Sequence, residues 1–331
     1  MLLSSLLFGK NESAISDSLN FVYNQSILDP ISKNYSSIFV TKKGIEGYGF
    51  FDNRAGFINI RGVGQGRRVA IYRDGIPMNL QIDGMPLIDI FNMGYVDNIS
   101  IEKGSSSLIY GKNAFGGVVN ITSFTDTTYG NSANTTIGYG SFNTQNYNLN
   151  SKLNRDKFIS NLSLNYKSSD GHRANSDFSR FDLYLRTQYK LNGNYNLKLN
   201  GSFTDVFSRN PGIVNRPLLR SLSDINIATI SFELSNKFSK ANGGLILYTT
   251  IYRNSINEGF VPSDFPTEYQ SIFKERIFGV RGNEDFTLKN SSILSAGFDY
   301  SYNAGNILRD DFKNIENNQE LLDANISELS M

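Results

Sequence analysis

From about residue 132 onward, apolar and polar side chains alternate with a period of two, and this pattern restricts the possible folds more than any other feature. The segment FISNLSLNYK (158–167) places phenylalanine, leucine and tyrosine on one face, and asparagine, serine and lysine on the other. Segments 181–191, 194–203 and 292–303 repeat the pattern. Successive side chains of a β-strand point to opposite faces, so each segment predicts a strand with one apolar and one polar face.

We count about nine such strands between residues 132 and 303. The segment 225–238 is less regular than the others, because its apolar positions change face between Ile227 and Ile230. An extra residue in one strand of a pair produces such a change, so we predict a β-bulge there or a misplaced strand boundary.

The connections between these strands alternate in length. Short turns at one end and long loops at the other are typical of an outer-membrane β-barrel. A soluble β-sandwich has the same alternation within its strands, but strands of ten or more residues with Tyr and Phe on the apolar face favour the barrel. The short turns are 153–157, 191–195, 240–244 and 288–292, and the long polar loops are 168–177, 205–224, 254–270 and everything after Asn303.

Composition removes several classes of function. Net charge is +1, from 32 Lys+Arg and 31 Asp+Glu, so the chain lacks the basic surface that nucleic-acid binding requires. It has no cysteine and one histidine, His172, in a polar loop, and no catalytic triad or paired-carboxylate cleft is apparent. We therefore expect no enzyme activity, no cofactor and no metal site.

The first 125 residues follow a different pattern. Residues 11–31 predict a short helix, and compact strands are predicted at 58–62, 68–78 and 96–104. This part of the chain has the pattern of a small mixed α+β domain. We place the domain boundary near residue 125, with 1–125 and 126–331 as the two units.

Three blocks of this first domain carry a family resemblance. They are INIRG (58–62), the Asp-Gly-Ile-Pro segment that ends the 68–78 strand, and VDNISIEKGSSSLIYGKNAFGGVVNIT (96–122). In this order they resemble the plug domain of TonB-dependent outer-membrane receptors, with Lys-Gly-Ser in place of the family's Arg-Gly-Pro. The signature residues are Arg61, Gly62, Asp74, Gly75, Pro77, Lys103, Gly104, Tyr110, Gly111, Gly116 and Gly117.

The resemblance implies a fold, a location and a function. The fold is a mixed α+β plug followed by antiparallel transmembrane β-barrel strands, here about nine of about 22. The location is the outer membrane of a Gram-negative bacterium, in contact with its lipid. The function is energy-dependent uptake of a scarce nutrient such as a ferric siderophore or cobalamin, driven by the TonB complex of the inner membrane. In this family plug arginines pair with barrel carboxylates, which implies anchoring roles for Arg61 and, with looser geometry, Lys103; the alternative for both is a solvated strand charge.

Ligand contacts are expected in two places. The loop 79–94 of the plug offers four candidates, and the long connection after residue 204 offers three arginines that would attract an anionic siderophore. Apolar packing is the alternative for Met85 and Phe91, and a solvated loop charge is the alternative for each arginine. The candidates are Gln81, Asp83, Met85, Phe91, Arg209, Arg216 and Arg220.

Two other functions stay open at this point: a non-functional remnant of such a receptor, and a β-rich adhesin or glycan-binding surface protein. The polar segment NNQELLDANISELSM (317–331) predicts an extracellular loop, and the first 57 residues contain no convincing TonB box. With too few strands to close a barrel, we expect a fragment or a truncated product.

Overall fold

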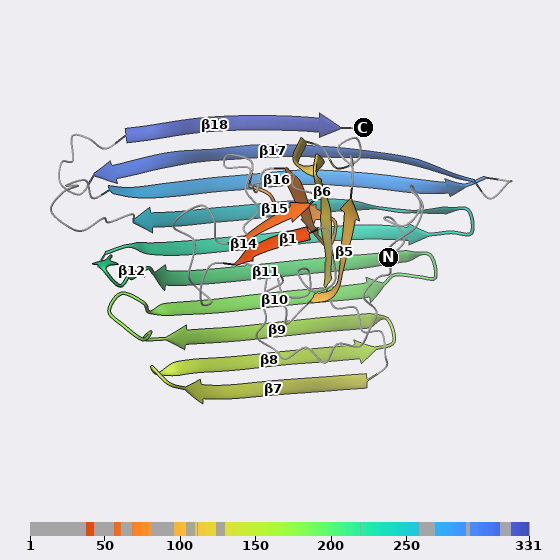
Figure 1. Cartoon of the computed structure of the whole chain (residues 1–331). Helices are drawn as coiled ribbons and strands as arrows, with labels where there is room; N and C mark the ends of the chain where they lie inside the picture. Colours follow the sequence, from red (N-terminus) through yellow and green to blue (C-terminus); the bar gives the residue numbers. More distant parts are fainter. Residues whose placement is uncertain are drawn as a thin grey trace.

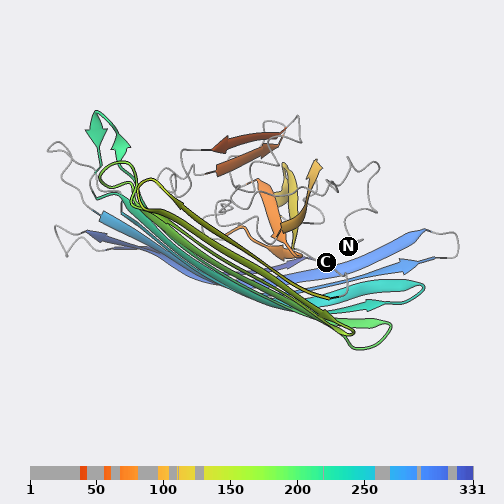
Figure 2. The same ribbon diagram turned by 90° about the horizontal axis from the view of Figure 1, so that it is seen from below.

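The chain folds as a long curved antiparallel sheet with a smaller group of strands, the plug, on its concave face (Figures 1 and 2). Within the part described, no helix is long and apolar enough to cross a membrane. The computed structural model describes residues 38–42, 56–60, 68–80, 96–103, 110, 112–123, 130–218, 220–257, 269–288, 292–311 and 319–330.

The large sheet, here called the wall, has ten strands in the order in which they follow one another along the chain, from β7 at one edge to β18 at the other, with β11 paired to β14. The small hairpin of β12 (Gly212–Ile213) and β13 (Arg216–Pro217) projects between two of them (Figure 2). The wall strands are β7 (Gly130–Gly140), β8 (Thr144–Arg155), β9 (Phe158–Ser169), β10 (Phe178–Lys190), β11 (Tyr195–Arg209), β14 (Leu222–Lys237), β15 (Ala241–Asn257), β16 (Tyr269–Thr287), β17 (Ile293–Asp311) and β18 (Gln319–Ser330).

The predicted alternation is confirmed in the wall. Along β9, Ile159 and the polar residues Asn161, Ser163 and Asn165 lie on the concave face and are buried. Phe158 and Tyr166 lie on the convex face and are exposed. The short connections, such as 156–157 and 238–240, lie at one end of the sheet, and the longer 170–177 and 210–221 lie at the other. We call the second end the loop end, and the first the turn end.

The prediction of a loop after Asn303 is wrong. β17 continues to Asp311, and Gln319–Ser330 forms a tenth strand, β18, paired with β17. The polar composition of this segment concealed the strand. Leu322, Ala324 and Ile326 of β18 lie on the concave face, together with Asn303 of β17. In the other wall strands the concave face is the polar one, so the apolar and polar faces of β18 are exchanged.

The irregular segment in β14 contains no bulge, because its pairing with β11 and with β15 runs without a register shift. Ile225 and Ile227 face the concave side and are buried, whereas Ile230 and Phe232 face outward and are exposed. Apolar residues change face here because the concave side of β14 is covered by the plug. The change of face, which predicted a bulge or a misplaced strand boundary, therefore marks the place where β14 contacts the plug.

The plug contains a four-stranded sheet of order β4-β3-β6-β5 and a separate two-stranded sheet, β1-β2. The predicted single strand at 68–78 is wrong: it is a hairpin, since the chain turns at Asp74 and Gly75. The helix predicted at 11–31 lies outside the described residues. The plug elements are β1 (Ile38–Lys42), β2 (Gly56–Ile60), β3 (Val69–Arg73), β4 (Ile76–Pro77), β5 (Val96–Lys103), a 3-10 turn (Lys112–Ala114) and β6 (Gly117–Ser123).

One hydrophobic core joins plug and wall. The plug contributes the face of its sheet that carries Ile71, Ile99 and Val119, and the wall contributes apolar side chains that interrupt its otherwise polar concave face. Burial of this apolar area holds the two bodies together. The wall residues of this core, here called the apolar seat, are Tyr184, Val206, Ile225, Ile227, Tyr248, Tyr252 and Ile277, with Ile246 and Phe273 packed against it.

Candidate functional site

The candidate site is the contact between the β3–β4 turn of the plug and the concave face of the wall. Asp74 and Gly75 connect β3 to β4 with φ values of 50° and 81°, which is the conformation of a tight two-residue hairpin turn. Asp-Gly is a preferred pair for this turn because both residues tolerate positive φ. The turn points at the wall, where a Cβ at Gly75 would lie 3.1 Å from Ile246 Cδ1.

The Asp74 carboxylate joins the two bodies. Arg186 Nη1 on β10 donates to Asp74 Oδ1 at 2.7 Å, and the Tyr184 hydroxyl donates to Asp74 Oδ2 at 3.0 Å. Ser123, at the end of β6, donates its backbone N–H to Oδ1 at 2.9 Å and its hydroxyl to Oδ2. The side chains of Asp74 and Arg186 are only 5% and 8% exposed, so this is a buried ion pair between plug and wall.

The surroundings of Asp74 keep it ionised. Burial by itself raises the pKa of a carboxyl, but the Arg186 guanidinium and the two Ser123 donors outweigh it and hold the pKa of Asp74 below its usual value. A charged group that accepts several hydrogen bonds inside a protein is well satisfied, whereas removal of one partner leaves the other charge buried and unpaired. The contact therefore holds strongly only when all its members are in place.

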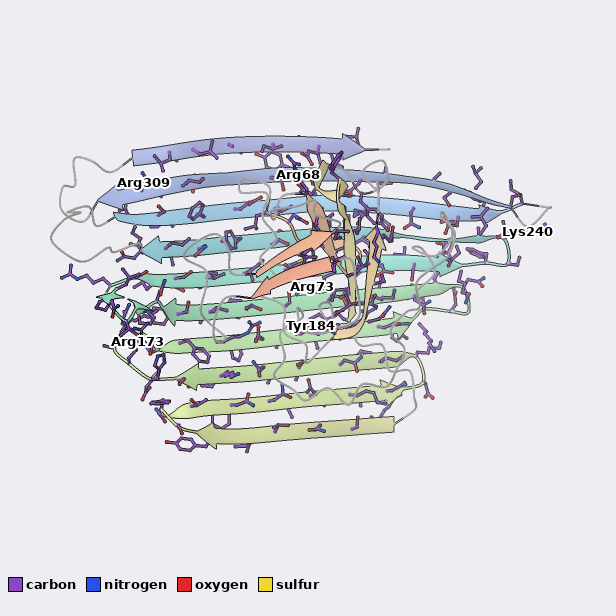
Figure 3. All side chains as sticks on the ribbon, in the orientation of Figure 1. Arg68, Arg73, Arg173, Tyr184, Lys240 and Arg309 are labelled. Atoms are coloured by element: carbon purple, nitrogen blue, oxygen red, sulfur yellow. The ribbon has the colours of Figure 1, made fainter. Side chains whose placement is uncertain are left out.

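Two further contacts flank this ion pair. Arg73 Nη2 donates to Ser202 Oγ on β11 at 2.5 Å, and Figure 3 shows Arg73 and Tyr184 together where the plug lies over the sheet. On the other side, Arg281 on β16 donates to the Gly75 carbonyl and lies 4.7 Å from the centre of the Tyr72 ring. The turn is thus held from β10 and β11 on one side and from β16 on the other.

A second polar cluster lies inside the plug. The Tyr110 hydroxyl donates to Glu102 Oε1 at 2.9 Å, and Asn120 Nδ2 donates to the same oxygen at 3.1 Å. Burial raises the pKa of Glu102, and these two donors only partly offset that effect. The Tyr72 hydroxyl donates to the Tyr110 carbonyl at 3.0 Å, so the tyrosine of the Leu-Ile-Tyr-Gly signature packs within the plug.

The signature residues fall into two groups. Asp74 and Gly75 form the wall contact, and Pro77 ends β4 beside it. Tyr110, Gly116 and Gly117 pack inside the plug, and Lys103 ends β5, half-buried. Gly117 has φ +146°, and a Cβ there would lie 2.5 Å from the Glu102 carbonyl oxygen. The signature residues outside the described part are Arg61, Gly62, Gly104 and Gly111.

The expected anchor had a plug arginine and a wall carboxylate. The described ion pair between the two bodies, Asp74 with Arg186, has the opposite polarity. The alternation over residues 181–191 predicts that Arg186 lies on the polar face of its strand. Nothing in the sequence identifies it as the partner of Asp74. Tyr184 and Arg281 were missed as well. One signal was present for Tyr184: it is an aromatic residue on the polar face of β10.

The predicted ligand residues are not brought together in the described part. Arg209 ends β11 instead of lying in a loop; it pairs with Asp177 at 3.4 Å and lies over the Phe207 ring. Arg220 is exposed in the connection before β14, and Arg216 is on β13, with its side chain outside the described part. Among described residues, no group of three or more His, Asp or Glu is arranged to hold a metal ion. The remaining candidates, also outside the described residues, are Gln81, Asp83, Met85 and Phe91.

A plug seated on the polar concave face of an up-and-down sheet, whose convex face is apolar, defines the class of plugged outer-membrane β-barrel proteins. Residues 12–118 match the family model of the TonB-dependent receptor plug domain. The chain therefore carries a plug domain of the TonB-dependent receptor family, followed by part of a β-barrel wall, and is an outer-membrane protein. No curated protein sequence matches it.

Solved structures show the same fold at low sequence identity. The unliganded ferric citrate transporter FecA aligns with a TM-score of 0.73 and 16% identity over 96% of this chain and 50% of its own. The pyoverdine receptor FpvA of Pseudomonas aeruginosa PAO1 gives 0.69 and 14% over 93% and 50%, and the copper transporter OprC gives 0.67 and 15% over 84% and 43%. The chain thus spans about half the length of the receptors it matches.

Proposed function

We propose that the protein carrying this chain is a receptor for energy-dependent uptake of a scarce nutrient, with a metal chelate such as a ferric siderophore, or cobalamin, as its cargo. The matched family and the similar structures are receptors and transporters, and those structures include a ferric citrate transporter, a pyoverdine receptor and a copper transporter. In this proposal the TonB complex of the inner membrane supplies the energy by acting on the plug.

The observation that carries the proposal is the way in which plug and wall are joined. Among the described residues, the plug is held on the wall by the buried Asp74–Arg186 ion pair, by hydrogen bonds such as that from Arg73 to Ser202, and by the apolar seat, and a chain without cysteine has no disulfide to fix it there. Such noncovalent contacts can break and re-form reversibly. A plug of this kind can therefore obstruct a lumen and still move under force. We assign the plug to residues 1–125 and the wall to 126–331; the boundary lies in 124–129, outside the described residues.

We also propose roles for the residues of the ligand path and the anchor. Arg216 and Arg220, near the β12–β13 hairpin, attract an anionic chelate from the loop end, and Gln81, Asp83 and Phe91 contact it from the plug. Arg209 contributes less, since Asp177 already balances its charge. Arg61 and Lys103 remain candidate anchors of the plug.

Uptake by living cells tests the proposal. Cells without their own siderophore receptors receive the full-length protein that carries this chain, and we expect them to accumulate radioactive iron from at least one ferric siderophore, or labelled cobalamin. Deletion of the TonB complex should abolish this accumulation. Accumulation that persists without the TonB complex would contradict the proposed mechanism, and the absence of accumulation with ferric siderophores, cobalamin and copper would contradict the proposed cargo.

A pair of variants tests the ligand path. The double variant R216A/R220A is expected to weaken uptake of an anionic chelate several-fold through a higher half-saturation concentration, because steering charge is lost. The matched control K237A/K240A removes the same charge at the turn end and should leave uptake unchanged. Equal effects of the two variants would argue against a role for these arginines in ligand capture.

A further inference from the structure

The loop between β9 and β10, residues 170–177 and here called the latch, is fastened to the neighbouring connection at the loop end. Its Asn175 side chain donates from Nδ2 to three backbone carbonyls of the connection that joins β11 to β14. They are those of Asn210, Leu218 and Ser221, at 2.7, 2.9 and 3.2 Å. The two N–H groups of one amide are shared among three acceptors, and together they hold the base of the β12–β13 hairpin.

The backbone of the latch presents this amide in a fixed position. Asn175 has a φ of 60°, a left-handed conformation that asparagine adopts more readily than most residues. Next to it, the Ser176 hydroxyl donates to the Arg173 carbonyl at 2.7 Å and accepts from the Arg173 N–H at 3.2 Å. The amide of Asn175 is therefore carried by a loop that closes on itself.

A second side chain of the latch reaches the hairpin itself. Arg173 Nη2 donates to the carbonyl of Gly212, the first residue of β12, and Figure 3 places Arg173 at the loop end of the wall. The hairpin has little pairing of its own, because each of its strands has two residues. A two-stranded hairpin alone is marginally stable at best in water, so the contacts from Arg173 and Asn175 determine where this one stands.

The latch is supported on its other side by the turn between β7 and β8. The Asp170 N–H donates to the Phe142 carbonyl at 2.9 Å, and the Ser169 hydroxyl donates to the same oxygen at 3.3 Å. The rings of Phe142 and His172 meet edge to face, with their centres 6.4 Å apart. Because the latch is tied to this turn as well, it can serve as a fixed support for the hairpin.

The connection that the latch holds carries the arginines proposed to capture the cargo. Arg216 lies on β13, and Arg220 is exposed in the segment that follows. At the tip of the hairpin, Val214 is 81% exposed. A binding surface that is already ordered loses less conformational freedom when it binds, so a fixed hairpin binds more tightly than a mobile one with the same charges.

We propose that Asn175 and Arg173 are positioning residues for cargo capture, because the latch holds the β12–β13 hairpin in its binding position before the cargo arrives. This inference rests on the proposed function, since it takes Arg216 and Arg220 as the capturing charges. The two latch residues act through the hairpin and not by touching the cargo. Without them only a fraction of the molecules has the hairpin in place, and the apparent affinity falls by that fraction.

The position of the hairpin is measured first, without cargo, in the purified full-length protein. This chain has no cysteine, so V214C places one spin label at the exposed tip, with any cysteine outside this chain replaced by serine. We expect a slow-motion paramagnetic resonance spectrum for V214C and a faster one for V214C/N175G. Glycine tolerates the left-handed backbone, so this change removes only the amide. The matched control V214C/N143G alters an asparagine of φ 52° in the β7–β8 turn and should leave the spectrum unchanged.

Uptake then tests the consequence for the cargo. The probe is an anionic ferric siderophore with radioactive iron that cells carrying the native protein accumulate. We expect N175G to raise the half-saturation concentration about fivefold and to leave the maximal rate unchanged, as the loss of about one net hydrogen bond predicts. N175D turns a carboxylate toward three carbonyls and should raise the half-saturation concentration further. N143G should behave as the native protein.

The other outcomes overturn the proposal. An unchanged spectrum in V214C/N175G shows that the hairpin keeps its place without the latch. A faster spectrum with an unchanged half-saturation concentration makes the latch a structural contact without a role in capture. If N175G does not fold, which loss of the heat-dependent gel shift of a barrel would reveal, R173Q is measured in the same way, and native behaviour there overturns the proposal as well. If the native protein accumulates no siderophore, the proposed function fails, and the spectra alone decide whether the latch holds the hairpin.

Discussion

Arg186 is a buried cation whose charge is balanced from the other body of the molecule, by Asp74 of the plug. The change D74N keeps the shape of the side chain but removes that charge, so Arg186 is left buried and unpaired. We expect the plug–wall contact to weaken by about 3 kcal/mol. Urea-dependent protease cleavage of the plug in the membrane-inserted protein measures this loss.

Two variants serve as controls for D74N. The double variant D74N/R186Q should be less destabilised than the sum of its single changes, because no charge is then left buried alone. S202A, which removes only the acceptor for Arg73, should cost about 1 kcal/mol. Strict additivity of D74N and R186Q would mean that the two groups do not act as a pair.

The lowered pKa of Asp74 predicts the pH dependence of the same contact. A carboxyl whose pKa is lower in the folded state stabilises that state above its unfolded pKa of about 3.9, and the contribution is lost as the pH falls through the lowered value. We therefore expect the plug to stay seated from neutral pH down to about pH 4 and to loosen below it. Protease sensitivity measured against pH should show this transition, and D74N should not show it; an identical acid transition in D74N would assign it to another group.

At the scale of elements, β6 lies so close to β5 and β2 that its first residue must be glycine. A Cβ on Gly117 would lie 2.5 Å from the Glu102 carbonyl oxygen and 2.8 Å from Ile60 Cδ1, and its φ of +146° disfavours a side chain. We expect G117A to destabilise the plug by about 3 kcal/mol in chemical unfolding. The control G201A adds a methyl group to open space on β11 and should change stability by about 0.5 kcal/mol or less.

The elements also show which parts of the fold were predictable. The wall strands were apparent because lipid on one side and a polar lumen on the other impose a period of two on nearly every residue, as in β9. That rule fails where the plug, instead of water, covers the concave face: Ile225 and Ile227 face inward there, and the sequence pattern predicts a bulge or a misplaced boundary in place of this contact. It fails again in β18, where Leu322, Ala324 and Ile326 face the concave side.

The candidate site was less predictable than the strands, for a physical reason. The turn at Asp74 and Gly75 follows from local chemistry, since Asp-Gly favours positive φ. Its partner Arg186 lies 112 residues away, and the contact depends on how two separate sheets come together. No pattern within a single strand encodes how the two sheets come together. The sequence indicates the contact only in part, through the apolar residues of the seat, which interrupt the polar face of the wall strands.

At the scale of the whole molecule, the proposed function requires the plug to move against the wall, and the absence of cysteine from the chain allows this to be tested directly. We expect the double variant D74C/R186C, joined by a thiol cross-linker with a reducible bond, to bind cargo at the cell surface but to stop its uptake. Reduction of the linker should restore uptake, because the obstruction is then free to move. The matched control S160C/T187C joins two neighbouring wall strands, β9 and β10, on the outer face, and should leave uptake unchanged with or without the linker. If cargo still enters while D74C/R186C is cross-linked, it passes without movement of this part of the plug, and the Asp74–Arg186 contact is then a fixed structural joint.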